Sequence, residues 1–302
     1  MIDMTVNIGG RRLKNPVLVS SGTFGFGKEY SNFYDFNLLG AITVKGITLK
    51  PRKGNKPPRI METSAGILNS VGLENPGLYS FIENELPFLK KYSVPIIANI
   101  SGNTIEEYSL MAKELNEHVD FIELNVSCPN VKEGGITFGT KPESVYEVTR
   151  EVRKVTNIPL IVKLSPNVTD IGEMALAAEN AGADCISLIN TLMGMAIDIY
   201  NRKPFFNNVV AGLSGPAVKP IALRMVWQVA QKVNIPIIGM GGISNWQDAI
   251  EFMMAGADAI SIGTANFYNP LAPKEVLEGI KEYMIENGIN DLREIKINGG
   301  VK

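Results

Sequence analysis

The chain has 302 residues, of which 45% are hydrophobic, so it can bury the core of one large barrel or of two medium domains. Its 29 Lys and Arg against 31 Asp and Glu leave no basic excess for a nucleic-acid backbone or a membrane surface. With two cysteines, no apolar leader or spanning run, and no C-x-x-C pair or His/Cys cluster, we expect a cytoplasmic protein without a metal site of its own.

Eight short apolar runs follow one another along the chain, separated by amphipathic segments such as "PESVYEVTREVRKV" and "NWQDAIEFMMAGA". The runs begin at Asn15, Ala41, Val94, Phe121, Pro159, Cys185, Pro236 and Ala259. Near-continuously apolar strands that alternate with helices indicate a parallel sheet covered on its faces. Eight such units predict a (β/α)8 TIM barrel that spans residues 1–302 as a single domain. A doubly wound open sheet is the alternative, but no G-x-G-x-x-G follows an early strand.

Two stretches interrupt this alternation. Residues 51–72 follow the second predicted strand, and residues 191–217 follow the sixth. Loops of this length are usually functional lids or contain small hairpins of their own. In a barrel both would emerge at the carboxyl ends of the strands, where the chemistry of such barrels is found.

The predicted strands end in hydrogen-bonding side chains or bare glycines. A single Asn or Ser at such a place can simply begin a turn. That explanation is weaker for Lys45 and Lys163, since each follows a β-branched apolar run and would place an ammonium group at the rim, which is rare without an anionic partner. The rim therefore predicts a site for an anionic or polar ligand.

Glycines at the ends of the last two strands predict a phosphate cradle. Gly241 and Gly242 end the seventh strand, and Gly263 and Thr264 end the eighth. Such glycines let a ligand approach the backbone and its N–H groups closely. A sugar phosphate, pyridoxal phosphate and flavin mononucleotide (FMN) all fit a cradle of this kind. The other rim residues favour FMN, because a flavin needs amide partners and a cation beside its pyrimidine edge.

Ten motifs together resemble the catalytic subunit of class 1 dihydroorotate dehydrogenases, over essentially the whole chain. They include "SSGTFGFG" at Ser20, "NSVGLENPG" at Asn69, "NVSCPNVKEGG" at Asn125, "INTLMGM" at Ile189 and "GMGGI" at Gly239. The resemblance implies a barrel with FMN at its carboxyl end that oxidises (S)-dihydroorotate to orotate in pyrimidine biosynthesis.

The resemblance assigns the catalytic base to Cys128. The reaction removes a proton from C5 of dihydroorotate and transfers a hydride from C6 to the flavin. A thiol with an ordinary pKa of about 8.5 needs only modest tuning to accept that proton near neutral pH. Cys185, inside the apolar run "DCISLIN", fits a buried inert thiol instead.

The resemblance also assigns the binding residues. It implies FMN contacts from Ser21, Lys45, Gly46, Asn99, Asn125, Lys163, Ile189, Gly215, Gly241, Gly242, Gly263 and Thr264. It implies substrate contacts from Lys45, Asn69, Ser70, Val71, Gly72, Leu73, Asn125, Asn190 and Thr191. Amide side chains suit a pyrimidine ring because each offers both a donor and an acceptor. Ala211, in "AGLSG", stands where the resemblance leads us to expect glycine.

The loops "CPNVKEGGITFG" and "NTLMGMAIDI" resemble the NAD-linked branch of that family. The resemblance then implies a homodimer joined to two electron-transfer subunits that carry FAD and a [2Fe–2S] cluster. Three alternatives stay open: a fumarate-dependent (class 1A) enzyme with the same chemistry, a barrel that uses Lys45 or Lys163 as a Schiff base, and a non-catalytic FMN-binding electron carrier.

Overall fold

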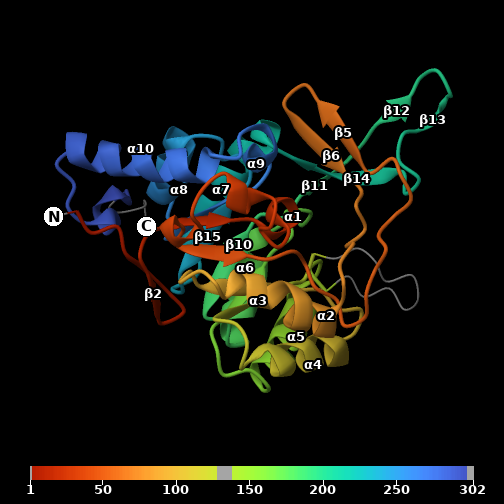
Figure 1. The fold of residues 1–302 in the computed structure, drawn as a ribbon, viewed down its shortest axis with the longest axis horizontal. Coiled ribbons are helices and arrows are strands. Elements are labelled where there is room, and N and C mark those ends of the chain that lie inside the picture. Colours follow the sequence, from red (N-terminus) through yellow and green to blue (C-terminus); the bar gives the residue numbers. More distant parts are fainter. Residues whose placement is uncertain (1, 128–137, 298–302) are drawn as a thin grey trace.

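Eight parallel strands close into a barrel in the computed structural model, which describes residues 2–127 and 138–297 (Figure 1). The strands lie in the cyclic order β10-β15-β16-β3-β4-β7-β8-β9. Their bounds are β3 Val17–Val19, β4 Ala41–Thr43, β7 Ile96–Ile100, β8 Phe121–Asn125, β9 Leu160–Lys163, β10 Cys185–Leu188, β15 Ile237–Met240 and β16 Ala259–Ile262. Each predicted apolar run supplies one strand, so the TIM barrel is confirmed and the open sheet is wrong.

Every residue of these eight strands is buried. Inward side chains fill the barrel and outward ones pack under the helices, and this two-sided burial explains why the strands read as continuous apolar runs rather than alternating ones. The exceptions are polar residues inside the barrel, among them Asn99, Glu123, Lys163 and Ser187. Because an unpaired polar group in such a core is costly, these residues need partners or a ligand.

Helices cover the barrel from outside. They are α1 Ser21–Phe24, α2 Leu78–Ser80, α3 Leu86–Leu89, α4 Ile105–Leu115, α5 Pro142–Arg153, α6 Ile171–Asn180, α7 Lys219–Ala230, α8 Trp246–Met254, α9 Ala265–Tyr268 and α10 Ala272–Glu286. Shorter turns lie at η1 Tyr30–Asn32, η2 Phe36–Leu38, η3 Phe81–Glu85, η4 Pro216–Val218 and η5 Leu292–Ile295. Three main helices start at side-chain caps, from Thr104 for α4, Asp170 for α6 and Asn245 for α8, which satisfy N–H groups that a helix start leaves free.

A repeated aspartate device holds the amino ends of the strands together. One aspartate stands just before β8, β10 and β16 in turn: Asp120, Asp184 and Asp258. Its carboxylate accepts a hydrogen bond from the first backbone N–H of the neighbouring strand, β7, β9 and β15, at 2.9, 2.8 and 2.9 Å. Each carboxylate also pairs with a cation: Asp120 with Arg11 at 3.0 Å, Asp184 with Arg153 at 2.6 Å and Asp258 with Lys296 at 2.6 Å. The starts of β7, β9 and β15 are therefore each held by a carboxylate that is itself paired with a cation.

The segments after β4 and after β10 meet in a second sheet. It has the order β11-β14-β6-β5, is antiparallel throughout, and projects from the barrel in Figure 1 with the small β12–β13 hairpin beyond it. The bounds are β5 Ile60–Thr63, β6 Gly66–Asn69, β11 Leu192–Met195, β12 Ile197–Asp198, β13 Lys203–Pro204 and β14 Val210–Ser214. A small core of Leu68, Phe206 and Ala211 supports it. The sheet stands at the carboxyl ends of the strands and brings two distant loops to one place.

The first and last described segments of the chain lie side by side at the other end of the barrel. The hairpin β1 Val6–Ile8 and β2 Arg11–Leu13 precedes β3, and Asp3 forms a bridge with Asp291 beside η5. Gly9 in this hairpin has φ +55°, and a Cβ there would lie 2.8 Å from the Cβ of Pro159, so the turn fits against the start of β9 only with glycine.

Candidate active site

The predicted glycine cradle is assembled at one edge of the barrel. Gly241 and Gly242 follow β15, and Gly263 and Thr264 follow β16, which is its hydrogen-bonded neighbour. Gly241 and Gly242 have φ values of +125° and +81°, a region that side chains rarely allow. These two turns therefore present bare backbone at the carboxyl ends of adjacent strands.

Gly215 comes from the end of the second sheet to complete the cradle. A Cβ on Gly215 would lie 3.4 Å from Cγ2 of Thr264, and one on Gly242 would lie 2.9 Å from the carbonyl oxygen of Gly215. The Oγ1 of Thr264 is 2.9 Å from the Oγ of Ser214. Three loops thus converge on one place, and added side chains would fill it.

A buried polar cluster lies inside the barrel at the same end. Asn99 of β7, Glu123 of β8 and Lys163 of β9 come from three consecutive strands. Glu123 Oε2 accepts a hydrogen bond from Nδ2 of Asn99 at 2.5 Å and lies 3.8 Å from Nζ of Lys163. Its Oε1 accepts a hydrogen bond from Oγ of Ser187 on β10 at 2.7 Å. The anionic partner expected for Lys163 is therefore Glu123.

Several polar atoms of this cluster have no partner in the part of the chain that the structure describes. Asn99 is completely buried, and its Oδ1 accepts no hydrogen bond; the Oγ of Ser101, which lies near the same Gly46, is likewise buried and unpartnered. Lys163 Nζ has the 3.8 Å ion pair but no hydrogen-bond acceptor among the described residues. Unsatisfied donors and acceptors side by side indicate a polar ligand that completes them.

Lys45 stands at the end of β4, and burial lowers the pKa of its ammonium group, although attraction to Glu74 opposes that shift. The next residue, Gly46, leaves room for its neighbours, since a Cβ there would lie 2.9 Å from Oδ1 of Asn99 and 3.4 Å from Cδ2 of Leu73. Lys45 is therefore an incompletely compensated cation on the segment that reaches the cluster through Gly46, which suits an anionic ligand.

The loop that follows β6 reaches this place with residues of the predicted substrate set. Leu73 has φ +55° and lies against Gly46, as described above. The side chain of Asn55 holds Ser70 by hydrogen bonds to its carbonyl oxygen and Oγ at 3.0 and 3.2 Å, and the backbone N–H of Asn55 binds the Val71 carbonyl at 2.9 Å. Gly72 packs against the same Asn55. Hydrogen bonds from Asn55 therefore hold the loop of residues 70–73 in place.

The three amide side chains of the predicted substrate set, Asn69, Asn125 and Asn190, are linked through their neighbours. Asn190 donates from Nδ2 to Oδ1 of Asn125 at 3.2 Å, and its own Oδ1 accepts from the N–H of Thr191 at 2.8 Å. Asn69 donates to the carbonyl oxygen of Gly212 at 3.1 Å, and a Cβ on Gly212 would lie 2.8 Å from Cβ of Thr191. Asn69, Asn125, Asn190 and Thr191 thus form one chain of neighbours.

Three more residues singled out in the sequence lie on segments at this end of the barrel. Ser21 is buried at the start of α1, directly after β3. Ile189 donates its N–H to the Met240 carbonyl at 2.9 Å, and a Cβ on Gly241 would lie 3.1 Å from Cγ1 of Ile189, so this residue lies beneath the cradle. Ala211 is buried within β14.

Of the two cysteines, only Cys185 lies in the described part of the chain. It is completely buried in β10, and burial raises its pKa well above the ordinary value, as expected for an inert thiol. The predicted base, Cys128, lies outside the described residues. Its neighbours Asn125 and Ser127 are described, and Asn125 Oδ1 accepts a hydrogen bond from the N–H of Ser127 at 3.2 Å.

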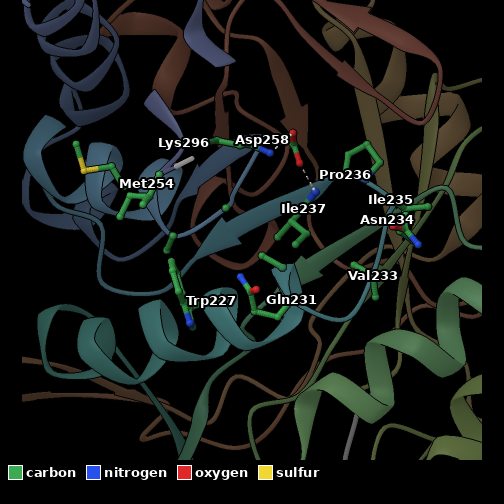
Figure 2. A pocket seen from close by; sticks show the side chains of 14 residues that line it. Trp227, Gln231, Val233, Asn234, Ile235, Pro236, Ile237, Met254, Asp258 and Lys296 are labelled. Carbon is green, nitrogen blue, oxygen red and sulfur yellow. Dashed lines mark hydrogen bonds and ion pairs between the residues drawn. The ribbon is translucent and has the colours of Figure 1, made fainter. Parts of the chain in front are cut away.

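A cavity of about 290 Å³ lies at the opposite end of the barrel (Figure 2). Its lining includes Trp227 of α7, Met254 of α8 and Ile237, the first residue of β15. The charged groups in it, Asp258 and Lys296, are paired with each other, and Asp258 also holds the N–H of Ile237. This cavity belongs to the aspartate device at the strand starts and lacks the unsatisfied groups of the carboxyl end.

Glu123 and Ser187 were not among the predicted site residues, although they organise the cluster. The sequence did carry a signal for Glu123, since a carboxylate in the apolar run "FIELN" is a charge that a strand core rarely accepts. Within residues 2–127 and 138–297, no group of three or more His, Cys, Asp or Glu residues could hold a metal ion. No helix in these ranges is long and apolar enough to cross a bilayer.

Comparison with known proteins identifies the family. The model of the family described as dihydroorotate dehydrogenase matches residues 3–284. The dihydroorotate dehydrogenase B (NAD(+)) catalytic subunit of Thermoanaerobacter pseudethanolicus is 60% identical over 295 residues, 97% of this chain and 98% of the relative. The proteins of the same description from Alkaliphilus metalliredigens and Caldicellulosiruptor saccharolyticus are both 58% identical, over 98% and 97% of this chain and 98% of each relative.

Proposed function

This chain belongs to the dihydroorotate dehydrogenase family, and we propose that it is the catalytic subunit of an NAD⁺-linked enzyme that oxidises (S)-dihydroorotate to orotate in pyrimidine biosynthesis. The observation that carries the proposal is the 60% identity, over 97% of this chain, to a subunit of that description. The geometry at the carboxyl end supports it, because a glycine cradle and a buried polar cluster with unsatisfied amide and hydroxyl oxygens lie at one end of the barrel.

The residues present fit FMN, the cofactor of this subunit in the family. The cradle of Gly215, Gly241, Gly242, Gly263 and Thr264 would hold the phosphate through backbone N–H groups. Asn99 and Lys163 would complete their hydrogen bonding on the polar edge of the ring system, with Ser21, Gly46, Asn125 and Ile189 around it. When bound, FMN supplies the acceptor for the hydride that leaves C6 of the substrate.

The substrate is an anion with ring amides, and the described residues offer partners for both parts. The desolvated ammonium of Lys45 suits the carboxylate. Asn69 and Asn190 each keep a donor and an acceptor for the ring, whereas Asn125, whose Oδ1 already accepts from Ser127 and Asn190, offers its Nδ2 donor; Thr191 and the loop of residues 70–73 lie beside them. Since these groups are held by hydrogen bonds to one another, the site is organised before the ligand arrives.

Cys128 takes the proton from C5 of dihydroorotate in this proposal. Removal of that proton by the Sγ thiolate and departure of the C6 hydride create the C5–C6 double bond of orotate, so the substrate loses two electrons and two hydrogens in all. No covalent adduct to sulfur is needed. A positioned base of this kind is typically worth 10²- to 10⁴-fold in rate.

The electron pair then passes out of this chain to NAD⁺ through a separate subunit. We propose that this partner carries FAD and a [2Fe–2S] cluster, and that two such partners join a homodimer of the present chain. The motifs "CPNVKEGGITFG" and "NTLMGMAIDI" support the NAD⁺-linked assignment, as do the relatives, which are catalytic subunits of NAD(+)-linked enzymes.

A visible spectrum of the purified chain tests cofactor and substrate together. We expect the paired bands of oxidised flavin, and we expect anaerobic dihydroorotate to bleach them. A colourless chain that cannot be loaded with FMN, or a flavin that dihydroorotate leaves oxidised, would contradict the proposal. Rapid turnover of the chain alone with fumarate would replace NAD⁺ as the acceptor while keeping the chemistry.

A further inference from the structure

The carboxylate of Glu123 is buried in the barrel directly beside two of the proposed FMN ligands. Only 2% of the residue is exposed, and both of its oxygens are engaged: Oε2 with Asn99 at 2.5 Å and Oε1 with Ser187 at 2.7 Å. Lys163 Nζ lies 3.8 Å from Oε2. One carboxylate therefore contacts side chains from three other strands of the barrel.

The position of these strands explains what the carboxylate does to its neighbours. β8 and β10 are separated by β9, so the bond from Glu123 to Ser187 crosses the barrel interior instead of joining adjacent strands. Asn99 and Lys163 extend from the strands on either side of β8. Ser187 anchors one oxygen, and the other oxygen is left to hold the two ligand side chains together.

Packing and hydrogen bonding alone do not require a charge at this place. A glutamine of the same shape could accept the hydrogen bond from Asn99, and its amide could donate to the hydroxyl of Ser187, without the cost of burying a charge. What glutamine cannot supply is a negative charge 3.8 Å from Lys163 Nζ. A carboxylate here offsets part of the positive charge that Lys163 would otherwise present to a ligand.

We propose that Glu123 is a positioning residue that aims Asn99 and Lys163 at the polar edge of FMN and lowers the reduction potential of the bound flavin. The inference rests on the proposed function. A reduced flavin that carries negative charge is stabilised by Lys163, and the carboxylate weakens that stabilisation while it keeps the ammonium group in place.

The deciding experiment is an anaerobic redox titration of the FMN-loaded chain against a reference dye, for wild type, Glu123→Gln and Ser187→Ala. In Glu123→Gln the ratio of reduced to oxidised flavin at a fixed solution potential should rise about tenfold. This corresponds to an increase of about 30 mV in the reduction potential of a two-electron couple. Ser187→Ala removes a hydrogen bond from the same carboxylate but keeps the charge, so its ratio should stay within about threefold of wild type.

An unchanged potential in folded, FMN-loaded Glu123→Gln would overturn the inference, and so would an equal rise in Ser187→Ala, because that would make the effect one of packing. If Glu123→Gln does not fold, Glu123→Asp decides: the shortened carboxylate withdraws from Asn99 and Lys163, and the dissociation constant of FMN should rise about tenfold or more. Unchanged FMN affinity in Glu123→Asp would then contradict the positioning role.

The wild-type chain separates this inference from the proposed function. A wild-type chain that cannot hold FMN, or whose FMN dihydroorotate does not reduce, contradicts the proposed function itself. A wild-type chain that holds FMN and is reduced, together with an unshifted potential in Glu123→Gln, contradicts only the role of Glu123.

Discussion

The two ends of the barrel treat polar groups in opposite ways. At the amino end, Asp120, Asp184 and Asp258 each accept a hydrogen bond from a strand N–H and pair with a cation. At the carboxyl end, buried atoms of Asn99 and Ser101 lack partners among the described residues. Paired groups stabilise a fold without a ligand, whereas unpaired ones cost free energy until a ligand satisfies them. The amino end therefore stabilises the barrel, and the carboxyl end is the one suited to bind a ligand.

The sharpest way to break the carboxyl end is to remove the proposed base. Cys128→Ala should leave FMN bound but slow anaerobic flavin reduction by dihydroorotate by at least about a hundredfold, because the C5 proton loses its acceptor. Stopped-flow absorbance of the flavin measures this rate. Cys185→Ala is the matched control: it removes a buried thiol that lies away from the cradle and should leave the rate unchanged. Near-normal reduction in Cys128→Ala would refute the base.

Removing the cation from the buried pair should damage both binding and folding. Lys163→Met takes away a charged ligand of FMN, so FMN affinity should fall about 10- to 100-fold. It also leaves Glu123 buried without its cation, which typically costs about 3–5 kcal/mol. Fluorescence titration with FMN and urea unfolding of the FMN-free protein measure the two effects.

The double variant Lys163→Met with Glu123→Gln separates these effects. Removing both charges should restore most of the lost stability, because neither group is then left as an unpaired ion. It should not restore FMN affinity, since the ammonium is still missing. Recovery of both, or of neither, would contradict the assignment of Lys163 to the flavin and Glu123 to Lys163.

A change at the amino end should show the opposite pattern. Asp258→Ala removes the hydrogen bond to the first N–H of β15 and the partner of Lys296, so it should lower the free energy of unfolding by about 1–3 kcal/mol. FMN affinity and the rate of flavin reduction should stay as in the wild type. Denaturant unfolding and stopped-flow reduction decide, and a loss of rate without a loss of stability would remove the contrast between the ends.

The barrel could be predicted from the sequence because burial on both faces leaves a local record, namely runs such as "PLIVKLS" that are apolar at nearly every position. Rim residues could be predicted for the same reason, since a polar residue that ends such a run stands out. The pairing of β6 with β14 in one sheet could not be predicted, because each segment shows only its own length and the pairing joins residues as far apart as Ile67 and Ser214, which are separated by 147 positions.

Glu123 marks the other limit of sequence reasoning. Its position inside "FIELN" was visible, but its partners come from three other strands, and only the closed barrel brings Asn99 and Ser187 to its two oxygens. The aspartate device could not be predicted from the sequence for a similar reason. An aspartate before a strand looks like a turn residue until the neighbouring strand start is placed within 3 Å of its oxygen.

The smallest expected effect is the loss of stability that the buried charge of Lys45 causes in the FMN-free protein. Burial, against the pull of Glu74, lowers the pKa of Lys45 from its ordinary 10.5. Between that lowered pKa and 10.5 the unfolded chain holds the proton more tightly than the folded one, so the stability of the FMN-free protein should rise with pH across this window. Below the window both states are protonated, and the folded state bears the full cost of the buried charge.

Lys45→Met should therefore raise the melting temperature of the FMN-free protein at pH 7, by about 2 °C, and the gain should be smaller at pH 10.5, which lies above the lowered pKa of wild-type Lys45. Differential scanning calorimetry at the two pH values measures it. Lys50→Met, at an exposed position five residues along the chain, should give no such gain. A gain that is the same at both pH values would mean that methionine simply packs better than lysine at this position. The charge of Lys45 would then not be what destabilises the FMN-free protein. A gain confined to the lower pH, with weaker binding of orotate in the same variant, would tie the instability of this end directly to its ligand.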